Sequence, residues 1–141
     1  MSANSRMTVA VHILSYLVLA SRKRSDPVTS EQIAKSVRTN PVVIRRLLGL
    51  LRKGGLVHSQ RGANAGWRLA RSPKAISLLD VYNAVHDDPL FGLHASAPNP
   101  QCPIGRGLPS TLRKVYGTLE DELRRHLART SVDEVLAETL G

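Results

Sequence analysis

The chain has 141 residues, of which 42% are hydrophobic and 22% charged, a composition that excludes global disorder and fits one folded domain. Twenty Lys and Arg against 11 Asp and Glu give a net charge of +9, and residues 1–74 alone hold 14 basic and 2 acidic residues. That half is suited to a polyanion. The single cysteine, Cys102, excludes an internal disulfide framework and any four-thiolate metal site built by one chain, and it fits a reducing cytoplasm.

The first predicted helix covers about residues 6–20 and is apolar on most of its sides. A helix of that kind lies at the centre of a domain or between subunits. Its apolar run, Met7 to Ala20, is short for a membrane span, so no membrane partner is expected. A signal peptide with Arg6 as its basic region is the alternative interpretation, which the lack of secreted-protein features disfavours. A polar loop is expected to follow, from Ser21 to Pro27.

Two shorter helices with clear ends are predicted next. Thr29 is the expected N-cap of a helix that ends near Val37, because Gln32 completes a capping box. Asn40 is the expected N-cap of the following helix, over about residues 41–53, where two glycines then give a stop signal. Two short helices joined by a tight turn, the second of them basic, predict a helix-turn-helix.

The second of these helices has two different faces. Four aliphatic residues at helical spacing form the expected buried stripe: Ile44, Leu47, Leu48 and Leu51. The opposite side carries Val42, Arg45, Arg46, Gly49 and Arg52. A solvated amphipathic helix would show the same pattern, and arginines contact phosphates more often than bases. Base reading by Arg45 and Arg46 is therefore one of two interpretations at this point.

A β-hairpin is predicted beside the basic helix. Residues 56–59 and 67–70 have strand character, and the turn between them contains two glycines and an asparagine. A hairpin next to a helix-turn-helix makes a wing. Arg61 begins the tip, and a tip this small fits a minor groove, whose negative potential attracts arginine. Trp67 is interpreted as the core anchor of the wing, with a base-stacking platform as the alternative.

The remaining chain is predicted to be helical on both sides of one long loop. A fourth helix follows Ser77 and ends near His86, after which the chain is irregular to residue 108. A long helix is predicted over residues 109–128 and a short one over residues 132–140. The long helix has an apolar stripe at i, i+3, i+4 and i+7 spacing, which suits a dimer interface. The stripe consists of Leu112, Val115, Tyr116, Leu119, Leu123 and Leu127.

The predicted fold class is thus mainly α with a small β-hairpin wing, a winged helix-turn-helix followed by a long C-terminal dimerisation helix. Three segments are expected. Residues 1–88 form the DNA-binding domain, residues 89–108 a sensor loop, and residues 109–141 the dimerisation helix with a short terminal helix.

Several stretches together resemble the Rrf-two family of bacterial winged-helix transcription regulators, the group of IscR, NsrR and CymR. They are Leu50 to Val57, Arg61-Gly62, Ala65 to Ala70 and Ile76 to Val85. The resemblance covers about residues 5–140 and implies a homodimer on a palindromic operator, with Arg61 in the minor groove. The expected DNA-binding residues are Thr29, Ser30, Asn40, Val42, Arg45, Arg46, Arg52, Arg61 and Asn64.

The loop before the long helix departs from the family pattern. Cluster-binding members carry three cysteines there, whereas this chain has Cys102 alone, so neither an iron–sulfur cluster nor another metal is expected. His58, His86 and His94 show no ligand-like spacing with it. The loop resembles that of a cluster-free, YwnA-like branch. Cys102 is interpreted either as a small packing residue or as a redox sensor, whose thiolate the nearby Arg106 would favour.

The sequence therefore predicts a cytoplasmic, sequence-specific DNA-binding transcription regulator, a repressor whose partners are double-stranded DNA and a second copy of itself. The signal would enter through Cys102 or through a small-molecule pocket near the dimer helix. A basic module that binds RNA or protein is one alternative, although five aromatic residues are few for stacking on bases. A small enzyme using Cys102 is another, although no catalytic motif accompanies the thiol.

Overall fold

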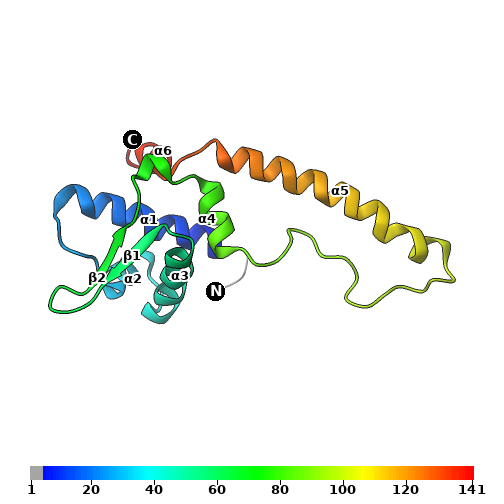
Figure 1. Cartoon of the computed structure of the whole chain (residues 1–141), viewed down its shortest axis with the longest axis horizontal. Helices are drawn as coiled ribbons and strands as arrows, with labels where there is room; N and C mark the ends of the chain where they lie inside the picture. The colour runs from blue at the N-terminus through cyan, green and yellow to red at the C-terminus, as the bar shows by residue number, and fades with distance from the viewer. Residues whose placement is uncertain (1–4) are drawn as a thin grey trace. The chain divides into compact units, whose positions relative to one another are not determined.

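The computed structural model describes residues 5–141, and within them it confirms a mainly α fold with a two-stranded wing (Figure 1). The elements are α1 (Arg6–Lys23), α2 (Ser30–Val37), α3 (Pro41–Lys53), β1 (Val57–Gln60), β2 (Gly66–Leu69), the 3-10 turn η2 (Pro73–Ala75), α4 (Leu78–Val85), α5 (Pro103–Ala128) and α6 (Val132–Leu140). The chain forms two compact units. One contains the residues up to 86 together with residues 127–141, and the other contains residues 87–126.

Helix α1 is the centre of the first unit, as its apolar character predicts. It contacts α2, α3, α4, α6 and β2. Its fully buried side is Ala10, Ile13, Leu14, Leu17 and Val18. The helix runs three residues beyond the predicted end, so the polar loop is shorter than expected. Arg22 and Lys23 lie in its last turn, where basic side chains interact favourably with the negative end of the helix dipole.

The helix-turn-helix has the predicted caps. Thr29 Oγ1 accepts a hydrogen bond from the Gln32 backbone N–H at 3.1 Å, and the Thr29 N–H donates to Gln32 Oε1 at 2.8 Å. Asn40 Oδ1 accepts from the Val42 N–H at 2.8 Å. Between the helices, Arg38 adopts the left-handed conformation with φ of 62°, which ends α2 and turns the chain into α3.

The aliphatic stripe of α3 is buried as predicted, with exposed fractions of 0–1% at all four positions. Removing one such leucine by truncation to alanine costs about 2–5 kcal/mol in typical cores. The stripe therefore fixes the orientation of α3, and the opposite side of the helix is left for a partner.

Both strands of the wing are displaced by one residue from the prediction: the first lies one residue later in the sequence and the second one residue earlier. β1 and β2 pair antiparallel, with Val57 opposite Leu69. The wing is joined to the segment before α2 by two backbone hydrogen bonds between Val28 and Trp67, of 2.8 and 3.0 Å. This close approach requires Gly66, because a Cβ atom there would lie 2.8 Å from the Val28 carbonyl oxygen. Trp67 is half-buried and packs against the core, which confirms the anchor interpretation.

The base of the wing is also fixed by Arg71. Asp80 forms the predicted capping box of α4 with Ser77, through hydrogen bonds of 2.9 and 3.0 Å. The same carboxylate is 3.4 Å from the Arg71 guanidinium, which also donates to the carbonyl oxygens of Gly54 and Gly55. One arginine thus connects the end of α3, the end of the wing and the start of α4.

The last helix, α6, packs in the same unit as the helix-turn-helix. The Val132 N–H donates to the Ile76 carbonyl oxygen at 2.9 Å, and the Leu78 N–H donates to that of Thr130 at 2.8 Å. Side chains of α6 are buried against α1 and η2. This grouping differs from the sequence-based segments, which placed the short helix with the long one.

The second unit consists of the irregular segment 87–102 followed by α5 up to His126. The prediction that this helix begins at Pro109 is wrong, because it begins six residues earlier at Pro103. Pro103 occupies the first helical position, where a missing N–H costs nothing, and the helix continues through Pro109 at the loss of one hydrogen bond. No helix within residues 5–141 is long and apolar enough to cross a membrane.

Candidate nucleic-acid interface

The exposed side of α3 carries four of the predicted DNA-binding residues. Val42, Arg45, Arg46 and Arg52 are all exposed, and they lie on the side opposite the buried stripe. Within residues 5–141 the Arg46 side chain has no hydrogen bond or ion pair. An apolar side chain among arginines can contact a thymine methyl group, while the arginines can reach phosphates or guanine edges. The face therefore has the groups that major-groove reading needs.

Arg45 differs from Arg46 because the protein itself holds its guanidinium. Arg45 Nη1 lies 3.1 Å from Glu31 Oε1 and donates to Ser30 Oγ at 3.3 Å. Ser30 was expected at the DNA surface, but this residue is buried, with an exposed fraction of 6%. Its hydroxyl is therefore positioned to hold Arg45 rather than to touch a duplex.

The other predicted contacts surround this face. Thr29 and Asn40 lie at the N-termini of α2 and α3, where their side-chain oxygens are used in capping. Backbone N–H groups at such helix ends are common phosphate-binding groups. Arg52 lies 5.9 Å from the centre of the Trp67 ring, a cation–π contact that ties the end of α3 to the wing.

The tip of the wing is exposed over residues 61–65, which include Arg61 and Asn64. Gly62 has φ of 100°, so the tight turn depends on a residue without a side chain. Arg61 makes no hydrogen bond or ion pair to the described part of the chain. A cation at the end of a narrow two-stranded ribbon can enter a minor groove without displacing the helix-turn-helix.

Cys102, on the second unit, precedes the first turn of α5 and is half-buried. Its carbonyl oxygen accepts from the Arg106 backbone N–H at 2.9 Å. The backbone N–H groups of Gly105 and Ile104 lower the pKa of its thiol, and partial burial acts in the opposite direction. The expected cause, the guanidinium of Arg106, is replaced by the helix N-terminus, because that guanidinium donates to a loop carbonyl oxygen instead.

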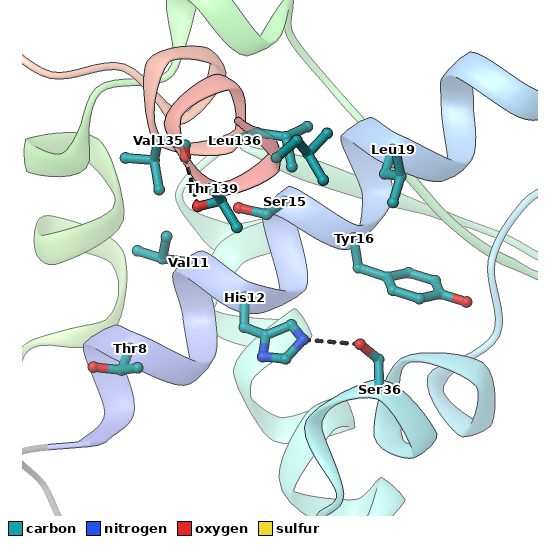
Figure 2. A pocket seen from close by; sticks show the side chains of 11 residues that line it. Thr8, Val11, His12, Ser15, Tyr16, Leu19, Ser36, Val135, Leu136 and Thr139 are labelled. Carbon is teal, nitrogen blue, oxygen red and sulfur yellow. Dashed lines mark hydrogen bonds between the residues drawn. The ribbon is translucent and has the colours of Figure 1, made fainter.

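An apolar groove of about 350 Å³ lies on the first unit between α1, α2 and α6 (Figure 2). Its lining contains no charged residue: Thr8, Val11, His12, Ser15, Tyr16, Leu19, Ser36, Val135, Leu136, Thr139 and Leu140. His12 Nε2 and Ser36 Oγ are hydrogen-bonded at 2.9 Å, which connects α1 to α2 at one side of the groove (Figure 2).

A second pocket, of about 420 Å³, lies on the second unit between residues 89–93 and α5. Phe91 packs on Tyr116 with ring centres 5.1 Å apart. Arg113, Gly117 and Glu120 also line this pocket, so it combines aromatic surface with one cationic and one anionic side chain.

Comparison with known proteins identifies the family. The profile of the Rrf2 family, described as iron-dependent transcriptional regulators, matches residues 3–138. The chain belongs to the Rrf2 family. YwnA of Bacillus subtilis (strain 168), whose name describes a transcriptional regulator of the helix-turn-helix type, is 39% identical over 134 residues, covering 94% of this chain and 96% of YwnA.

Solved structures agree with this assignment. A crystal structure described as that of a DNA-binding protein is 35% identical, covers 94% of this chain and 99% of its own, and has a TM-score of 0.74. IscR of T. potens is 21% identical, with coverage of 99% and 87% and a TM-score of 0.70, a likeness that shows the fold alone. This Rrf2 chain is a DNA-binding transcription regulator and not an enzyme.

The description of the Rrf2 family mentions iron, but the described residues of this member do not provide a suitable set of iron ligands. Among residues 5–141, no group of three or more His, Cys, Asp and Glu side chains is placed to hold a metal ion. Cys102 is the single thiol of the chain. Iron–sulfur clusters are held by several thiolates, so these residues do not fit a cluster bound by one chain.

Sequence reasoning missed one residue of this Rrf2 interface, Glu31. Its acidic character in a basic half was visible, but its place beside Arg45 depends on how α2 crosses α3. Residues 14 positions apart on two helices have no sequence spacing that predicts a contact.

Proposed function

We propose that this Rrf2 protein is a repressor that binds a palindromic operator as a homodimer and reads it with α3 and the wing. The supporting observation is that three exposed arginines, Arg45, Arg46 and Arg61, project from the two elements of one compact unit that winged proteins use on DNA. The protein acts in the cytoplasm, associated with the nucleoid when bound. Counterion release by the basic half supplies most of the affinity, and base contacts supply the specificity.

The apolar surfaces of the chain favour the homodimer. No residue of α5, all of which lies in the described range, is buried, and Val115 and Leu119 are 48% and 41% exposed. The remaining stripe residues are half-buried: Leu112, Tyr116, Leu123 and Leu127. A second copy that covers this stripe, together with the uncharged α1–α6 groove, would remove both surfaces from water. Two heads held at a fixed spacing then match two half-sites.

The first candidate for the regulatory signal is oxidation of Cys102, which requires no iron–sulfur cluster. The thiol lies at the first turn of α5, the proposed dimer helix, and its pKa is lowered by the N–H groups of that turn. Oxidation there would change the start of α5 and, through the dimer, the spacing of the two heads.

Sensing of a small molecule is the second candidate input. The pocket beside Phe91 and Tyr116 has a volume in the usual range for ligands, and Arg113 and Glu120 in its lining offer charges of both signs to a polar ligand. Tyr116 belongs to the predicted dimer stripe, so an occupant of the pocket would alter the same interface.

The proposed function is tested by selecting binding sites from random duplexes with the purified protein. A palindromic consensus, with tight binding to the duplex and weak binding to single strands of the same sequence, is the expected result. Genome-wide footprinting should then place such sites over promoters. Binding that is equal for all duplexes, or stronger for RNA, would overturn the proposal.

Replacement of either α3 arginine should relax the preference at one base pair of each half-site. Arg45→Ala or Arg46→Ala is expected to cost about 1–3 kcal/mol on the preferred site if the arginine makes two hydrogen bonds to guanine. The measurement is affinity for a set of operators with single base changes. A uniform loss on every sequence would show that the arginine contacts phosphates alone.

Replacement of the wing arginine should depend on the DNA that flanks the half-sites. A·T-rich flanks narrow the minor groove and strengthen its negative potential, so Arg61→Ala should weaken binding to A·T-flanked operators more than to G·C-flanked ones. Asn64→Ala at the same tip is a control for shape without charge. Equal losses on both flanks would exclude groove reading by Arg61.

A further inference from the structure

Glu31 is one of two acidic residues among the first 74, the other being Asp26. It lies in the first turn of α2, with Oε1 3.1 Å from Nη1 of Arg45 on α3. Both side chains are accessible, with exposed fractions of 61% for Glu31 and 50% for Arg45. A carboxylate on a surface that approaches phosphates lowers affinity for any DNA. Its presence beside an arginine of the reading face therefore calls for a compensating role.

The contacts of Arg45 hold one nitrogen of its guanidinium. Nη1 donates to Glu31 Oε1 and also to Ser30 Oγ at 3.3 Å, and the Ser30 hydroxyl donates to Glu31 Oε2 at 3.3 Å. Because Ser30 is buried, this three-residue cluster is anchored in the protein. Nη2 and Nε of Arg45 make no hydrogen bond to any of residues 5–141.

The free side of this guanidinium has the donors that guanine requires. Guanine presents two acceptors, O6 and N7, in the major groove, and arginine reads them with two neighbouring N–H groups. The Nη2–Nε edge keeps such a pair when Nη1 is engaged. An unrestrained arginine can instead swing to a phosphate, which carries no sequence information. A carboxylate beside it opposes that alternative by repulsion and by holding the side chain.

We propose that Glu31 determines the DNA specificity of α3 by holding Arg45 for a guanine contact and by keeping this arginine away from the phosphates of unrelated DNA. The inference rests on the proposed function, since it requires that α3 reads a duplex. Glu31 acts here as a positioning residue, through Arg45.

The test compares the wild type with Glu31→Gln, which keeps the shape of the side chain and removes its charge. Glu31→Gln should bind an unrelated duplex about 3–10-fold more tightly than the wild type. Its salt dependence should also be steeper: the slope of log K against log salt should change by about 0.9, because one phosphate contact is added. Arg45→Ala identifies the base pair that Arg45 reads. At that base pair, the preference of Glu31→Gln for guanine should fall by about 5–10-fold, which is part of the discrimination that one arginine–guanine contact with two hydrogen bonds provides.

Asp26→Asn is the matched control, because it removes the other acidic charge of this half, and within residues 5–141 Asp26 forms no hydrogen bond or ion pair with α3. It should leave the guanine preference unchanged. In an Arg45→Ala background, Glu31→Gln should have no further effect on base preference. The thermal midpoint of Glu31→Gln should stay close to that of the wild type, because exposed ion pairs contribute little stability.

Three outcomes overturn the inference. The first is that the wild type binds a specific site and Glu31→Gln shows the same preference for guanine as the wild type. The second is a Glu31→Gln effect that persists without Arg45, which would assign Glu31 a DNA contact of its own. The third is a wild type without any site preference, which overturns the proposed function together with this inference.

Discussion

Leu123→Asp is expected to convert the protein to monomers and to weaken operator binding by about 10²–10⁴-fold, the usual gain from linking two binding modules. Leu123 lies in the C-terminal half of the α5 stripe, where a partner helix would bury it. Truncation of one buried leucine costs about 2–5 kcal/mol, and the homodimer contains two copies of the change. An unpaired carboxylate in such an interface adds a desolvation cost.

Sedimentation and operator titration measure the two effects, and circular dichroism checks that the first unit remains folded. Ser110→Asp is the matched control, because it adds the same carboxylate to an exposed position on the opposite face of α5. That variant should remain dimeric and bind as the wild type does. A tight dimer with Leu123→Asp would exclude the α5 stripe as the interface and direct attention to the groove between α1 and α6.

Local signals explain why most helices could be predicted. The caps at Thr29, Asn40 and Ser77 depend on side chains within three residues of the helix they begin, and all three are found in the structure. The buried stripe of α3 follows from helical periodicity alone. Helix caps and helical periodicity depend on residues that are close in the sequence. They can therefore be predicted without knowing the tertiary contacts.

The errors occurred where distant contacts or backbone preferences compete. The predicted start of the long helix at Pro109 is wrong, because Pro103 fills the first helical position and the helix tolerates the second proline in its interior. The place of α6 depends on backbone hydrogen bonds between residues more than 50 positions apart, such as Val132 and Ile76. The same holds for the site: its exposed arginines could be predicted, whereas the contact of Glu31 with Arg45 could not.

Cys102 has one property that could be predicted from the sequence and one that could not. Its candidacy as a sensor followed from a lone thiol in a loop rich in proline and glycine. The cause of its lowered pKa did not follow, because the helix start was predicted six residues too late. With α5 beginning at Pro103, the backbone N–H groups of Ile104 and Gly105 in its first turn lower the pKa of the Cys102 thiol. Those groups favour the thiolate, which is the nucleophilic form of cysteine.

Hydrogen peroxide is therefore expected to weaken operator binding by the wild type, by about 10-fold or more if the coupling is of the usual size for allosteric proteins. The Cys102 thiolate attacks one peroxide oxygen, an S–O bond forms, the O–O bond breaks and hydroxide leaves. The sulfur is thereby oxidised to a sulfenic acid and the peroxide is reduced. The neutral product loses the charge that the first turn of α5 stabilises, so the start of the proposed dimer helix changes.

Cys102→Ser is the appropriate control, because serine is a good N-cap that keeps an acceptor at the start of α5 but is inert to peroxide. Operator titration before and after treatment, with mass spectrometry to confirm oxidation, should show a loss for the wild type and none for the variant. Alkylation of the folded wild type by iodoacetamide should persist to lower pH than alkylation of the urea-unfolded chain, since the folded pKa is lowered. If oxidised wild type binds unchanged, or Cys102→Ser responds equally, Cys102 is a packing residue, and the pocket beside Phe91 and Tyr116 becomes the leading candidate for the input.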